Sequence, residues 1–380
     1  MEKTYHTIVI GAGPAGLNAA RFLKQKTLVL DKKSSVGHPV QCGEGVSISA
    51  LSREGLEPND RWKACCIRRI KRIMPNGKYI GERHADPYAV VLRRERFEAH
   101  LAGMVPWEIR MNAHVTNIQQ RDGLFVVETA TGDRLYAERL IGADGPNSIV
   151  AKKVFQYRPA CAPAVNYGVN FASSILSDEL HMYFGSHIAP SGYGWLFPTS
   201  SHSANVGLLM KEKGNLGNRF TYFTDTVIKP LFGDFQRVKN KSGVLPVSGF
   251  YQSISKGDAF LAGDAGAFTD PIFEGGINMA LLTGRLCAEG INMDDPGYYQ
   301  KCIDDLPFSG SDLVDARRIF YGFPDAVLND LGDVIDGNST AYLETEAGRR
   351  AFSAKPNLVS RQAEIASFAR TWRMAKPYIW

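Results

Sequence analysis

The chain has 380 residues, of which 44% are hydrophobic and 22% are charged. This length predicts two or three domains, and this composition excludes a disordered, a collagen-like and a coiled-coil chain. The net charge of +5 is too small for the concentrated basic face of a nucleic-acid-binding protein. The six cysteines are too sparse for a disulfide framework and show no zinc-binding spacing, so we expect a protein of the reducing cytoplasm.

The first predicted unit is a strand, a glycine-rich turn, a helix and a second strand. The apolar run Thr7–Ile10 leads directly into the sequence Gly-Ala-Gly-Pro-Ala-Gly of residues 11–16, so we expect no signal peptide. Residues 17–23 favour a helix, and the second strand, Thr27–Leu30, ends at Asp31. The pattern G-x-G-x-x-G in this setting indicates a dinucleotide-binding site.

Each glycine of this turn has a separate physical task. Gly11 allows the tight turn, Gly13 lets the backbone approach a pyrophosphate, and Gly16 lets the helix pack closely on the strand. The amides at the start of the helix favour the negative phosphates. Asp31 follows at the distance where a carboxylate accepts hydrogen bonds from ribose hydroxyls.

A short basic segment follows, and it is predicted to form a hairpin. Pro75-Asn76-Gly77 is a turn signal between the strands Ile67–Ile73 and Lys78–Ile80. The first of these strands carries four cations in seven residues. We favour a solvated edge strand, in which Lys and Arg oppose aggregation. A docking face for anionic lipid headgroups or for an acidic electron donor is the alternative.

Four further strands are predicted to form one antiparallel sheet: residues 165–171, 180–185, 193–197 and 204–210. The stretch Leu180–Met210 contains no Asp, Glu, Lys or Arg, and its Ser, His, Gly, Pro and Asn residues exclude a membrane span. It must therefore line an uncharged site or be buried on both faces.

Two more predicted strands end in an aspartate beside a glycine. Leu140 and Ile141 lead into Gly-Ala-Asp-Gly at residues 142–145, and Ala259–Ala262 lead into Gly263-Asp264. Residues 270–278 then read Asp-Pro-Ile-Phe-Glu-Gly-Gly-Ile-Asn and begin a helical run to Cys287. After about residue 313 helical patterning dominates.

These three motifs, in this order, resemble the FAD-dependent superfamily of aromatic hydroxylases and geranylgeranyl reductases. The resemblance implies that Asp264 holds the ribitol of FAD and that Gly275–Asn278 present backbone amides to the flavin. Leu92–Glu98 resembles a helix start of the same superfamily, which implies a phosphate contact for Arg94. Ala151 stands where the superfamily often has an arginine, and this departure argues against a pyridine nucleotide docking there.

Two further segments narrow the family. Gly192–Pro198 looks like the Tyr-x-Trp-x-Phe-Pro signature of geranylgeranyl reductases, and Gly37–Val46 resembles the Cys-Gly-Glu-Gly loop of their archaeal-type members. The resemblance covers about the first 320 residues. It implies a FAD-dependent reductase of isoprenoid, geranylgeranyl-type carbon–carbon double bonds in lipid biosynthesis, acting by hydride transfer from reduced flavin.

The motifs and the resemblance together predict the site residues. The residues expected to contact FAD are Gly11, Gly13, Pro14, Ala15, Gly16, Asp31, Lys32, Cys42, Gly43, Arg94, Val115, Asp144, Gly145, Gly263, Asp264, Gly275, Gly276, Ile277 and Asn278. The residues expected to bind the substrate are Tyr193, Trp195 and Phe197, and the alternative is that all three are core residues of a strand. No metal site is predicted.

We expect Cys42, Tyr193 and Trp195 at the reacting groups. Reduction of an isolated alkene needs a hydride on one carbon and a proton on the other. A thiol is mostly protonated at neutral pH, so Cys42 is the candidate proton donor. Glu44, Tyr193 or a water are the alternative acids, and Cys42 as a small buried hydrophobe is the alternative without chemistry.

The domain organisation follows from the placement of the motifs. We predict an α/β, Rossmann-like FAD-binding domain from residues 1–66, 94–155 and 256–325, an inserted antiparallel-sheet (α+β) substrate domain from residues 67–93 and 156–255, and a helical C-terminal region from residues 326–380. The expected partners are a prenyl-lipid or other isoprenoid substrate and an external electron donor, either NAD(P)H or a small redox protein such as a ferredoxin. We expect a cytoplasmic protein, with peripheral contact to the inner face of the membrane left open.

Three other functions remain as alternatives. A flavin monooxygenase or halogenase of an aromatic is disfavoured, because Tyr193 and Phe197 replace the Trp and Ile of the halogenase Trp-x-Trp-x-Ile-Pro segment. An electron-transfer flavoprotein of the quinone-reductase type would need an iron–sulfur cluster, and no cysteine lies beyond Cys302 to bind one, although a partner could. A flavin-free binding module is excluded if the purified protein is yellow.

Overall fold

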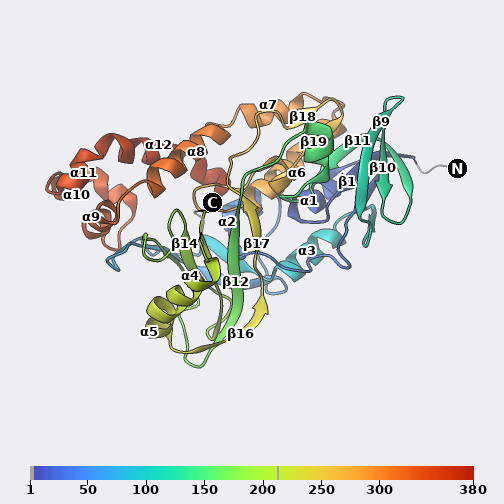
Figure 1. Cartoon of the computed structure of the whole chain (residues 1–380). Helices are drawn as coiled ribbons and strands as arrows, with labels where there is room; N and C mark the ends of the chain where they lie inside the picture. Colours follow the sequence, from blue (N-terminus) through green and yellow to red (C-terminus); the bar gives the residue numbers. More distant parts are fainter. Residues whose placement is uncertain (1–3, 212–213) are drawn as a thin grey trace.

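The structure is a computed structural model that describes residues 4–211 and 214–380. It is a mixed α/β fold of three sheets with a helical C-terminal region, which confirms the predicted fold class. The molecule is elongated, with β9 and β10 at one end and the helices α9 to α12 at the other (Figure 1).

The first sheet carries the glycine-rich turn. Its strands are β1 (Thr4–Ile10), β2 (Thr27–Leu30), β8 (Glu108–Arg110), β9 (Val115–Arg121), β10 (Leu124–Thr129), β11 (Arg134–Gly142), β18 (Ser255–Lys256) and β19 (Ala259–Leu261). The order is β18-β19-β11-β1-β2-β8, and β19, β11, β1, β2 and β8 run parallel. β10 pairs antiparallel with β11 and with β9. The helix α1 (Pro14–Phe22) connects β1 to β2, and α6 (Ile277–Asn292) packs on α1.

The second sheet is formed by the inserted segments. Its strands are β5 (Arg69–Ile73), β6 (Tyr79–Ile80), β12 (Cys161–Phe171), β13 (Glu179–Tyr183), β14 (Tyr193–Pro198), β15 (Ser203–Leu209), β16 (Phe235–Asn240) and β17 (Gly243–Pro246). The order is β16-β12-β15-β14-β13-β5-β6, with β17 beside β12. The four strands predicted to share one sheet do so, and β5 and β6 form the predicted hairpin.

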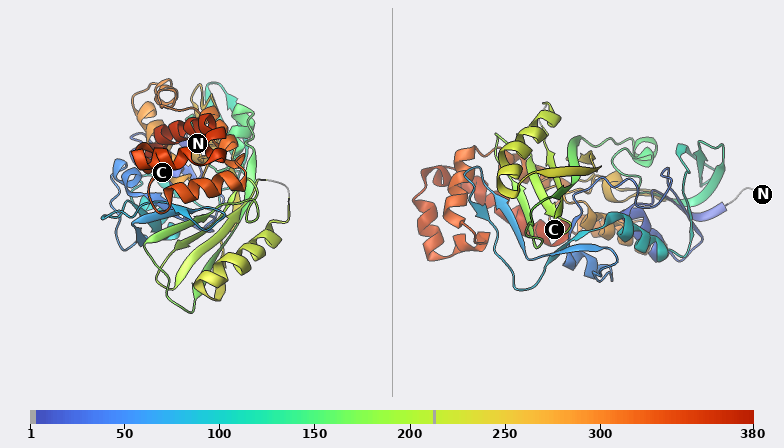
Figure 2. Two further views of the ribbon diagram at one scale, coloured as in Figure 1. Left: turned by 90° about the vertical axis from the view of Figure 1, so that its left-hand side faces the viewer. Right: turned by 90° about the horizontal axis from the view of Figure 1, so that it is seen from below.

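The two faces of this inserted sheet pack against different cores. Every residue of β13 and β14 is buried, so these two strands of the charge-free stretch are buried on both faces. Trp195 belongs to the large core shared with α6, whereas Leu196 packs with Phe223 of α4 (Leu216–Phe223). The left view of Figure 2 shows the sheet between the C-terminal helices and α4. Tyr193, Trp195 and Phe197 thus share one face of β14, and Leu196 points to the other.

A small third sheet and the remaining helices complete the fold. The small sheet has the order β3 (Gly45–Ser47), β7 (Ala89–Leu92), β4 (Lys63–Ile67). The remaining helices are α2 (Ile48–Arg53), α3 (Arg94–Gly103), α5 (Lys229–Phe232), α7 (Tyr298–Asp304), α8 (Gly310–Tyr321), α9 (Asp325–Ile335), α10 (Glu346–Ser353), α11 (Pro356–Ser360) and α12 (Gln362–Ile379). The last of these contacts α8, α6 and α2, so the C-terminal region reaches the first half of the chain. Within the described residues, no helix combines the length and hydropathy needed to cross a membrane.

The basic segment is not a solvated edge strand, so this prediction is wrong. β5 pairs with β13 on one side and with β6 on the other. Arg69 and Lys71 both form ion pairs with Glu179, whose side chain has no exposed surface. Two of the cations of this strand therefore neutralise a buried carboxylate, and the sequence pattern could not show that carboxylate because it lies on another strand.

Candidate functional site

The glycine-rich turn has close contacts at two glycines and open space at the third. Gly11 has φ +108°, and a Cβ there would lie 2.2 Å from the carbonyl oxygen of Ala143. A Cβ on Gly16 would lie 1.9 Å from the carbonyl oxygen of Gly11. A Cβ on Gly13 would meet no atom within 4 Å. The start of α1, with Pro14 in its first turn, therefore faces open space.

Asp31 supports this turn from the end of β2. Its side chain is buried, and its carboxylate accepts hydrogen bonds from the backbone N of Ala12 at 2.7 Å and of Lys33 at 2.8 Å. Lys32, in contrast, is exposed. The carboxylate is thus held at the edge of the turn, where the ribose contact of a dinucleotide is expected.

Asp264 lies against the start of α6. Its carboxylate accepts a hydrogen bond of 2.5 Å from the Thr269 hydroxyl, and a Cβ on Gly276 would lie 3.4 Å from its Oδ1. Burial raises the pKa of Asp264. Asn278, one residue into the helix, donates from Nδ2 to the Ser47 hydroxyl at 3.1 Å. The structure thus brings the Gly-Asp motif and the Gly-Gly-Ile-Asn motif together.

Two other residues predicted to contact the cofactor, Asp144 and Val115, are in contact with other residues of the chain. The carboxylate of Asp144 accepts hydrogen bonds from the Ser148 hydroxyl at 2.5 Å and from the backbone N of Ile149 at 2.6 Å, so it caps the following turn. Val115 is buried in the apolar core below the first sheet. Next to Asp144, a Cβ on Gly145 would meet no atom within 4 Å. The cofactor contacts of Asp144 and Val115 stay predictions.

The Cys-Gly-Glu-Gly loop is fastened to the inserted sheet. Asn166 of β12 donates from Nδ2 to the carbonyl of Cys42 at 2.8 Å, and Asn205 of β15 donates to the carbonyl of Gly43 at 3.1 Å. The Sγ of Cys42 accepts a hydrogen bond of 3.1 Å from the backbone N of Glu44, and its side chain is half-buried. Sequence reasoning missed both asparagines, because no motif contains them.

Glu44 is the charged centre of this loop. Its buried carboxylate accepts hydrogen bonds from Asn205 Nδ2 at 2.6 Å and from the backbone N of Arg94 at 3.0 Å, and it forms an ion pair with Lys241. The guanidinium of Arg94 forms an ion pair with Glu98. Burial opposes this charge, but Glu98 raises the pKa of Arg94. The predicted phosphate contact of Arg94 therefore stays a prediction, since its guanidinium already has a carboxylate partner.

The aromatic signature lies directly against this loop. A Cβ on Gly43 would lie 3.1 Å from the ring of Phe197 and 3.5 Å from Nε1 of Trp195. The ring centroids of Tyr193 and Trp195 are 5.7 Å apart, and those of Trp195 and Phe197 are 6.4 Å apart. Each of these three side chains is only 6% exposed. Both the substrate role and the core role of this aromatic row are compatible with such burial.

Trp380 joins the site from the C-terminal region, which showed no motif in the sequence. A Cβ on Gly45 would lie 3.6 Å from its indole ring, and a Cβ on Gly275 would lie 3.4 Å from its Nε1. Within the described chain, Nε1 of Trp380 and Nε1 of Trp195 are buried without a hydrogen-bond partner. Two unpartnered buried donors and the open space at Gly13 fit a site that holds a further polar group.

Glu274 is, after Trp380, a second candidate site residue that the sequence analysis did not identify. It has φ +57° and lies in the loop before α6, and its carboxylate forms a buried ion pair with Arg317 of α8. Its Oε2 is buried without a partner among the described residues, and burial raises its pKa to about 8. The only sign of this residue in the sequence was that Glu274 is the one acidic residue between Asp270 and Gly275.

Comparisons with known proteins agree with this arrangement. The sequence model of the family described as "Geranylgeranyl reductase catalytic domain" matches residues 161–244, which contain the aromatic signature. A digeranylgeranylglycerophospholipid reductase of Methanocella arvoryzae is 30% identical over 75% of this chain and 77% of its own length. A digeranylgeranylglycerophospholipid reductase of Methanococcoides burtonii is 31% identical over 78% of this chain and 77% of its own length.

The chain belongs to the geranylgeranyl reductase family. It is accordingly a flavin-dependent oxidoreductase that reduces isoprenoid carbon–carbon double bonds, and the resemblance inferred from the motifs is confirmed. The fold agrees with this membership. A geranylgeranyl bacteriochlorophyll reductase-like protein of Thermoplasma acidophilum superposes with a TM-score of 0.82, at 24% identity, over 96% of this chain and all of its own. A flavin-dependent brominase superposes with a TM-score of 0.69 at 17% identity over 97% of this chain and all of its own, so the fold is shared with halogenases.

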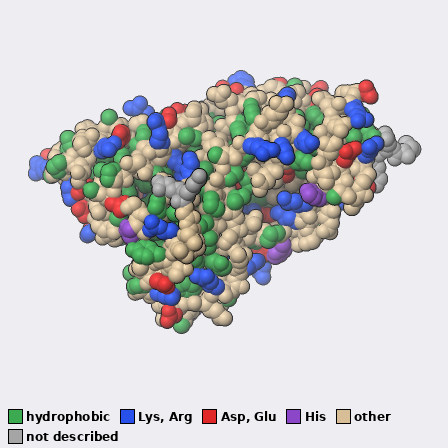
Figure 3. Space-filling view, viewed as in Figure 1, with side chains coloured by type: hydrophobic (Ala, Val, Ile, Leu, Met, Phe, Trp, Pro, Cys, Tyr) green, Lys and Arg blue, Asp and Glu red, His purple; other side chains and the backbone are tan. Residues whose placement is uncertain are grey.

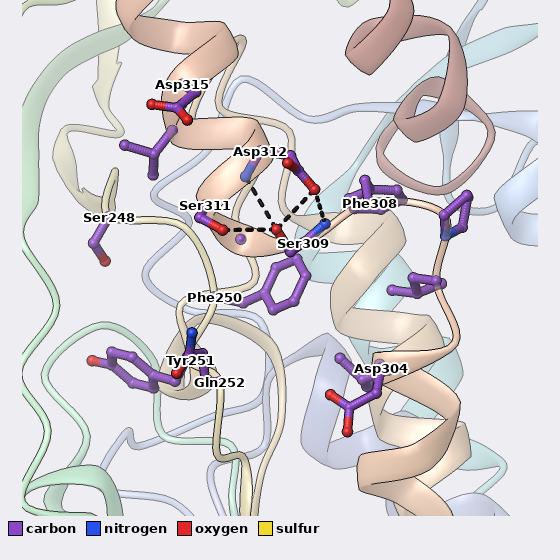
Figure 4. A pocket seen from close by; sticks show the side chains of 15 residues that line it. Ser248, Phe250, Tyr251, Gln252, Asp304, Phe308, Ser309, Ser311, Asp312 and Asp315 are labelled. Carbon is purple, nitrogen blue, oxygen red and sulfur yellow. Dashed lines mark hydrogen bonds between the residues drawn. The ribbon is translucent and has the colours of Figure 1, made fainter.

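A surface hollow lies at the start of α8 (Figure 4). It has a volume of about 870 Å³ and is lined by parts of residues 248–252 and 303–315. Asp304, Asp312 and Asp315 line it, so its negative charge would repel the phosphates of a dinucleotide. None of the residues predicted to bind FAD or substrate lines this hollow.

Proposed function

We propose that the chain is an FAD-dependent reductase of digeranylgeranylglycerophospholipids, the substrate class in the names of its relatives. One observation carries this proposal: the Cys-Gly-Glu-Gly loop packs directly on the Tyr-x-Trp-x-Phe face, with Gly43 against Phe197. The Cys-Gly-Glu-Gly loop, which belongs to the predicted FAD-binding domain, thus contacts the uncharged aromatic strand β14. A reaction between a flat cofactor and an apolar chain needs such a meeting point.

The residues proposed to hold FAD come from three places in the chain. The open space at Gly13 receives the pyrophosphate at the start of α1, and Asp31 binds the ribose hydroxyls. Asp264 binds the ribitol, and the amides of Gly276 and Ile277 face the flavin ring. When bound, the flavin supplies the hydride for the alkene.

The substrate side is proposed to be the aromatic face of β14. Tyr193, Trp195 and Phe197 present rings without charge, and the strand is flanked by strands with no exposed polar side chains on this face. An apolar prenyl chain gains about 25 cal/mol per Å² of apolar surface removed from water. This face therefore favours the tail of the lipid.

Cys42 is proposed to deliver the proton. Its Sγ accepts a hydrogen bond from the backbone N of Glu44, and the guanidinium of Arg94 lies close enough for Cys42 to raise its pKa. A backbone donor and a nearby cation both stabilise the sulfur after it has given up a proton. The thiol can then be reprotonated before the next turnover.

A peripheral contact with the inner face of the membrane is part of the proposal. At the edge of the inserted sheet, Tyr222, Leu231 and Val238 are exposed apolar side chains, at 43%, 64% and 56%. Lys229 and Lys239 flank them in sequence. Figure 3 shows basic and acidic side chains beside the hydrophobic ones on this lower end of the molecule. Lys229 is ion-paired with Asp225, and Lys239 forms no ion pair with any described residue. Exposed apolar groups next to lysines suit a surface of anionic lipids, from which a reductase of membrane lipids would take its substrate.

The experiment reduces the protein-bound flavin by light without oxygen and then adds a digeranylgeranylglycerophospholipid. We expect the lipid to reoxidise the flavin and to lose double bonds, measured by absorbance and mass spectrometry. Reoxidation only after oxygen and an aromatic are added would replace the proposal by a monooxygenase. NADH, NADPH and a reduced ferredoxin, each tested as the reductant in place of light, identify the electron donor.

A further inference from the structure

Arg72 is a cation that forms no ion pair with any residue described by the structure, and it is turned toward the same side as the aromatic signature. In the inserted sheet, Arg72 of β5 pairs with Met182 of β13, and Met182 pairs with Trp195 of β14. Residues paired in this way on neighbouring strands point to one face of a sheet. Neighbouring strands are about 4.8 Å apart, so Arg72 lies about 10 Å from Trp195 on that face.

The surroundings of this guanidinium are aromatic. It lies 5.6 Å from the ring centroid of Phe273 and 5.7 Å from that of Trp372. Its Nε is buried and has no acceptor in the described parts of the chain, which also contain no ion pair to Arg72. Burial lowers the pKa of Arg72. A buried cation that lacks a counter-ion is costly, and an arriving anion removes this cost.

A second cation approaches from the C-terminal helix. Lys376 lies one turn after Trp372 on α12, so both project from the same side of the helix. Its pKa is lowered by burial and by the positive charge of Arg72, which places the two cations near each other. Lys376 forms no ion pair with any described residue, and the residue is exposed to solvent although part of its side chain is buried. The cluster can therefore be reached from outside.

One carboxylate lies nearby, and it does not neutralise the cluster. Glu82 acts on both Lys376 and Tyr88 through its charge, and its carboxylate lies 3.7 Å from Nε2 of His84. The hydroxyl group of Tyr88 is close to Arg72, which lowers its pKa against the effect of burial. Two cations face one carboxylate here, and a hydroxyl donor lies beside them. The place is thus suited to one more anion.

A continuous row of rings connects this cluster to the Cys-Gly-Glu-Gly loop. The neighbouring ring pairs are Phe197–Trp195, Trp195–Tyr193, Tyr193–Phe184, Phe184–Phe273 and Phe273–Trp372, with centroids 4.8 to 6.4 Å apart. One end of the row lies at Gly43, and the other end lies at Arg72. A row of buried apolar rings that ends at a cation with no ion pair among the described residues has the same two-part chemistry as an amphiphile with an anionic head.

We propose that Arg72 and Lys376 form a binding site for a phosphate group, and that this phosphate is the headgroup of the prenyl lipid whose tail follows the aromatic row. The proposal rests on the proposed function, because it assigns the polar end of that substrate. A planar guanidinium offers two parallel donors to a phosphate, and Lys376 adds a point charge.

The test measures binding to the flavin-loaded protein with its flavin oxidised, so that no turnover is needed. The two main probes share one digeranylgeranylglycerol tail, and one carries a phosphate where the other carries a hydroxyl. We expect Arg72→Gln to weaken binding of the phosphate lipid about tenfold to a hundredfold, the loss of a charge-assisted contact. The hydroxyl lipid should bind within about twofold of its original strength, because it has no charge to lose.

Three further variants keep the result interpretable. Lys376→Gln should also weaken binding of the phosphate lipid, and it removes less packing than Arg72→Gln does. Arg72→Lys keeps the positive charge and should therefore bind the phosphate lipid more tightly than Arg72→Gln. Arg370→Gln removes an exposed cation from the same helix and should change neither dissociation constant. Flavin content and melting temperature show whether Arg72→Gln is folded; if it is not, Lys376→Gln and Arg72→Lys decide.

Inorganic phosphate separates the two sources of the anion. If the headgroup is the ligand, phosphate competes only with the phosphate lipid and only in the protein with Arg72. If inorganic phosphate binds at Arg72 while the lipid phosphate gives no advantage over the hydroxyl, the site takes free phosphate, and its assignment to the headgroup is overturned. If Arg72→Gln weakens binding of both lipids equally, or of neither, the anion site itself is overturned. Should neither lipid reoxidise the reduced flavin while their affinities still differ at Arg72, the proposed reductase function fails and the anion site stands.

Discussion

The hydroxyl of Tyr193 donates a hydrogen bond of 2.7 Å to the backbone carbonyl of Phe273, and both residues are buried. This bond joins the first residue of β14 to the loop that precedes α6. It therefore fixes the position of the aromatic strand relative to the Gly-Gly-Ile-Asn segment. Burial raises the pKa of Tyr193, which keeps its hydroxyl protonated and able to donate. The substrate face and the predicted flavin loop are therefore coupled through one side chain.

Tyr193→Phe should loosen this coupling without emptying the core. The variant leaves the Phe273 carbonyl without its donor, at a cost of about 1 to 3 kcal/mol in the free energy of unfolding. We expect unchanged flavin content and a slower reoxidation of reduced flavin by the prenyl lipid. Tyr183→Phe is the matched control, because Tyr183 bonds His181 on the opposite face of the sheet. Equal slowing in both variants would show that general stability, and not the coupling, sets the rate.

Gly13→Val should give a folded protein that has lost its flavin. Its side chain would occupy the open space at the start of α1, where the pyrophosphate is proposed to lie, and no protein atom within 4 Å opposes it. The expected result is colourless protein with a melting temperature close to that of the flavin-free original. Gly103→Val at the end of α3 also meets no atom within 4 Å and should stay yellow. A yellow Gly13→Val protein would place the dinucleotide elsewhere.

The strand–turn–helix unit and the inserted sheet were predictable because their signals are local. Gly11 and Gly16 stand where a side chain would strike a neighbouring carbonyl, and the alternation of Trp195 and Leu196 fixes which face each enters. The contact of Gly16 with Gly11 and the alternation along β14 act between residues close in sequence, whereas Gly11 faces the distant Ala143 and was predictable from its place in the G-x-G-x-x-G pattern. Asp264 and Gly276, although their contact is tertiary, were predictable because they belong to ordered family motifs.

The partners of charged side chains were not predictable in the same way. Arg69 is satisfied by Glu179, more than a hundred residues away, so its segment resembled a solvated edge strand. The same distance hid the bond of Asn205 to Glu44, and Trp380 reaches the site only because α12 packs back onto the first half of the chain. Composition shows how many charges a segment has, but only the fold shows which of them face each other.

Cys42→Ala and Cys42→Ser separate a proton donor from a packing residue. If Cys42 donates the proton, the alanine variant should reduce its flavin normally and then be reoxidised by the prenyl lipid at least about tenfold more slowly, since general acid catalysis contributes at least this much. The serine variant keeps the size of the side chain with a weaker acid and should also be slow. Stopped-flow absorbance without oxygen measures both half-reactions. Unchanged reoxidation in both variants would remove Cys42 from the mechanism and make Tyr193, whose hydroxyl stays protonated because burial raises its pKa, the next acid to replace.

Glu179→Gln should destabilise the protein most at neutral pH and least in acid. Burial alone would raise the pKa of Glu179, but hydrogen bonds from His181 and Lys71 lower it below its ordinary value of 4.5. A carboxyl group whose pKa is depressed by folding stabilises the protein above that ordinary value, and the stabilisation is lost as the pH falls below it. Removing one partner of a buried ion pair costs about 3 to 5 kcal/mol, so this is the expected gap in unfolding free energy near pH 7. Urea unfolding of both proteins at neutral pH and near pH 3 measures whether the gap narrows.

Asp178→Asn, which removes the neighbouring and more exposed partner of Arg83, should cost less than about 1 kcal/mol. A gap that is the same at both pH values would mean that packing of the side chain, and not its charge, holds β5 against β13.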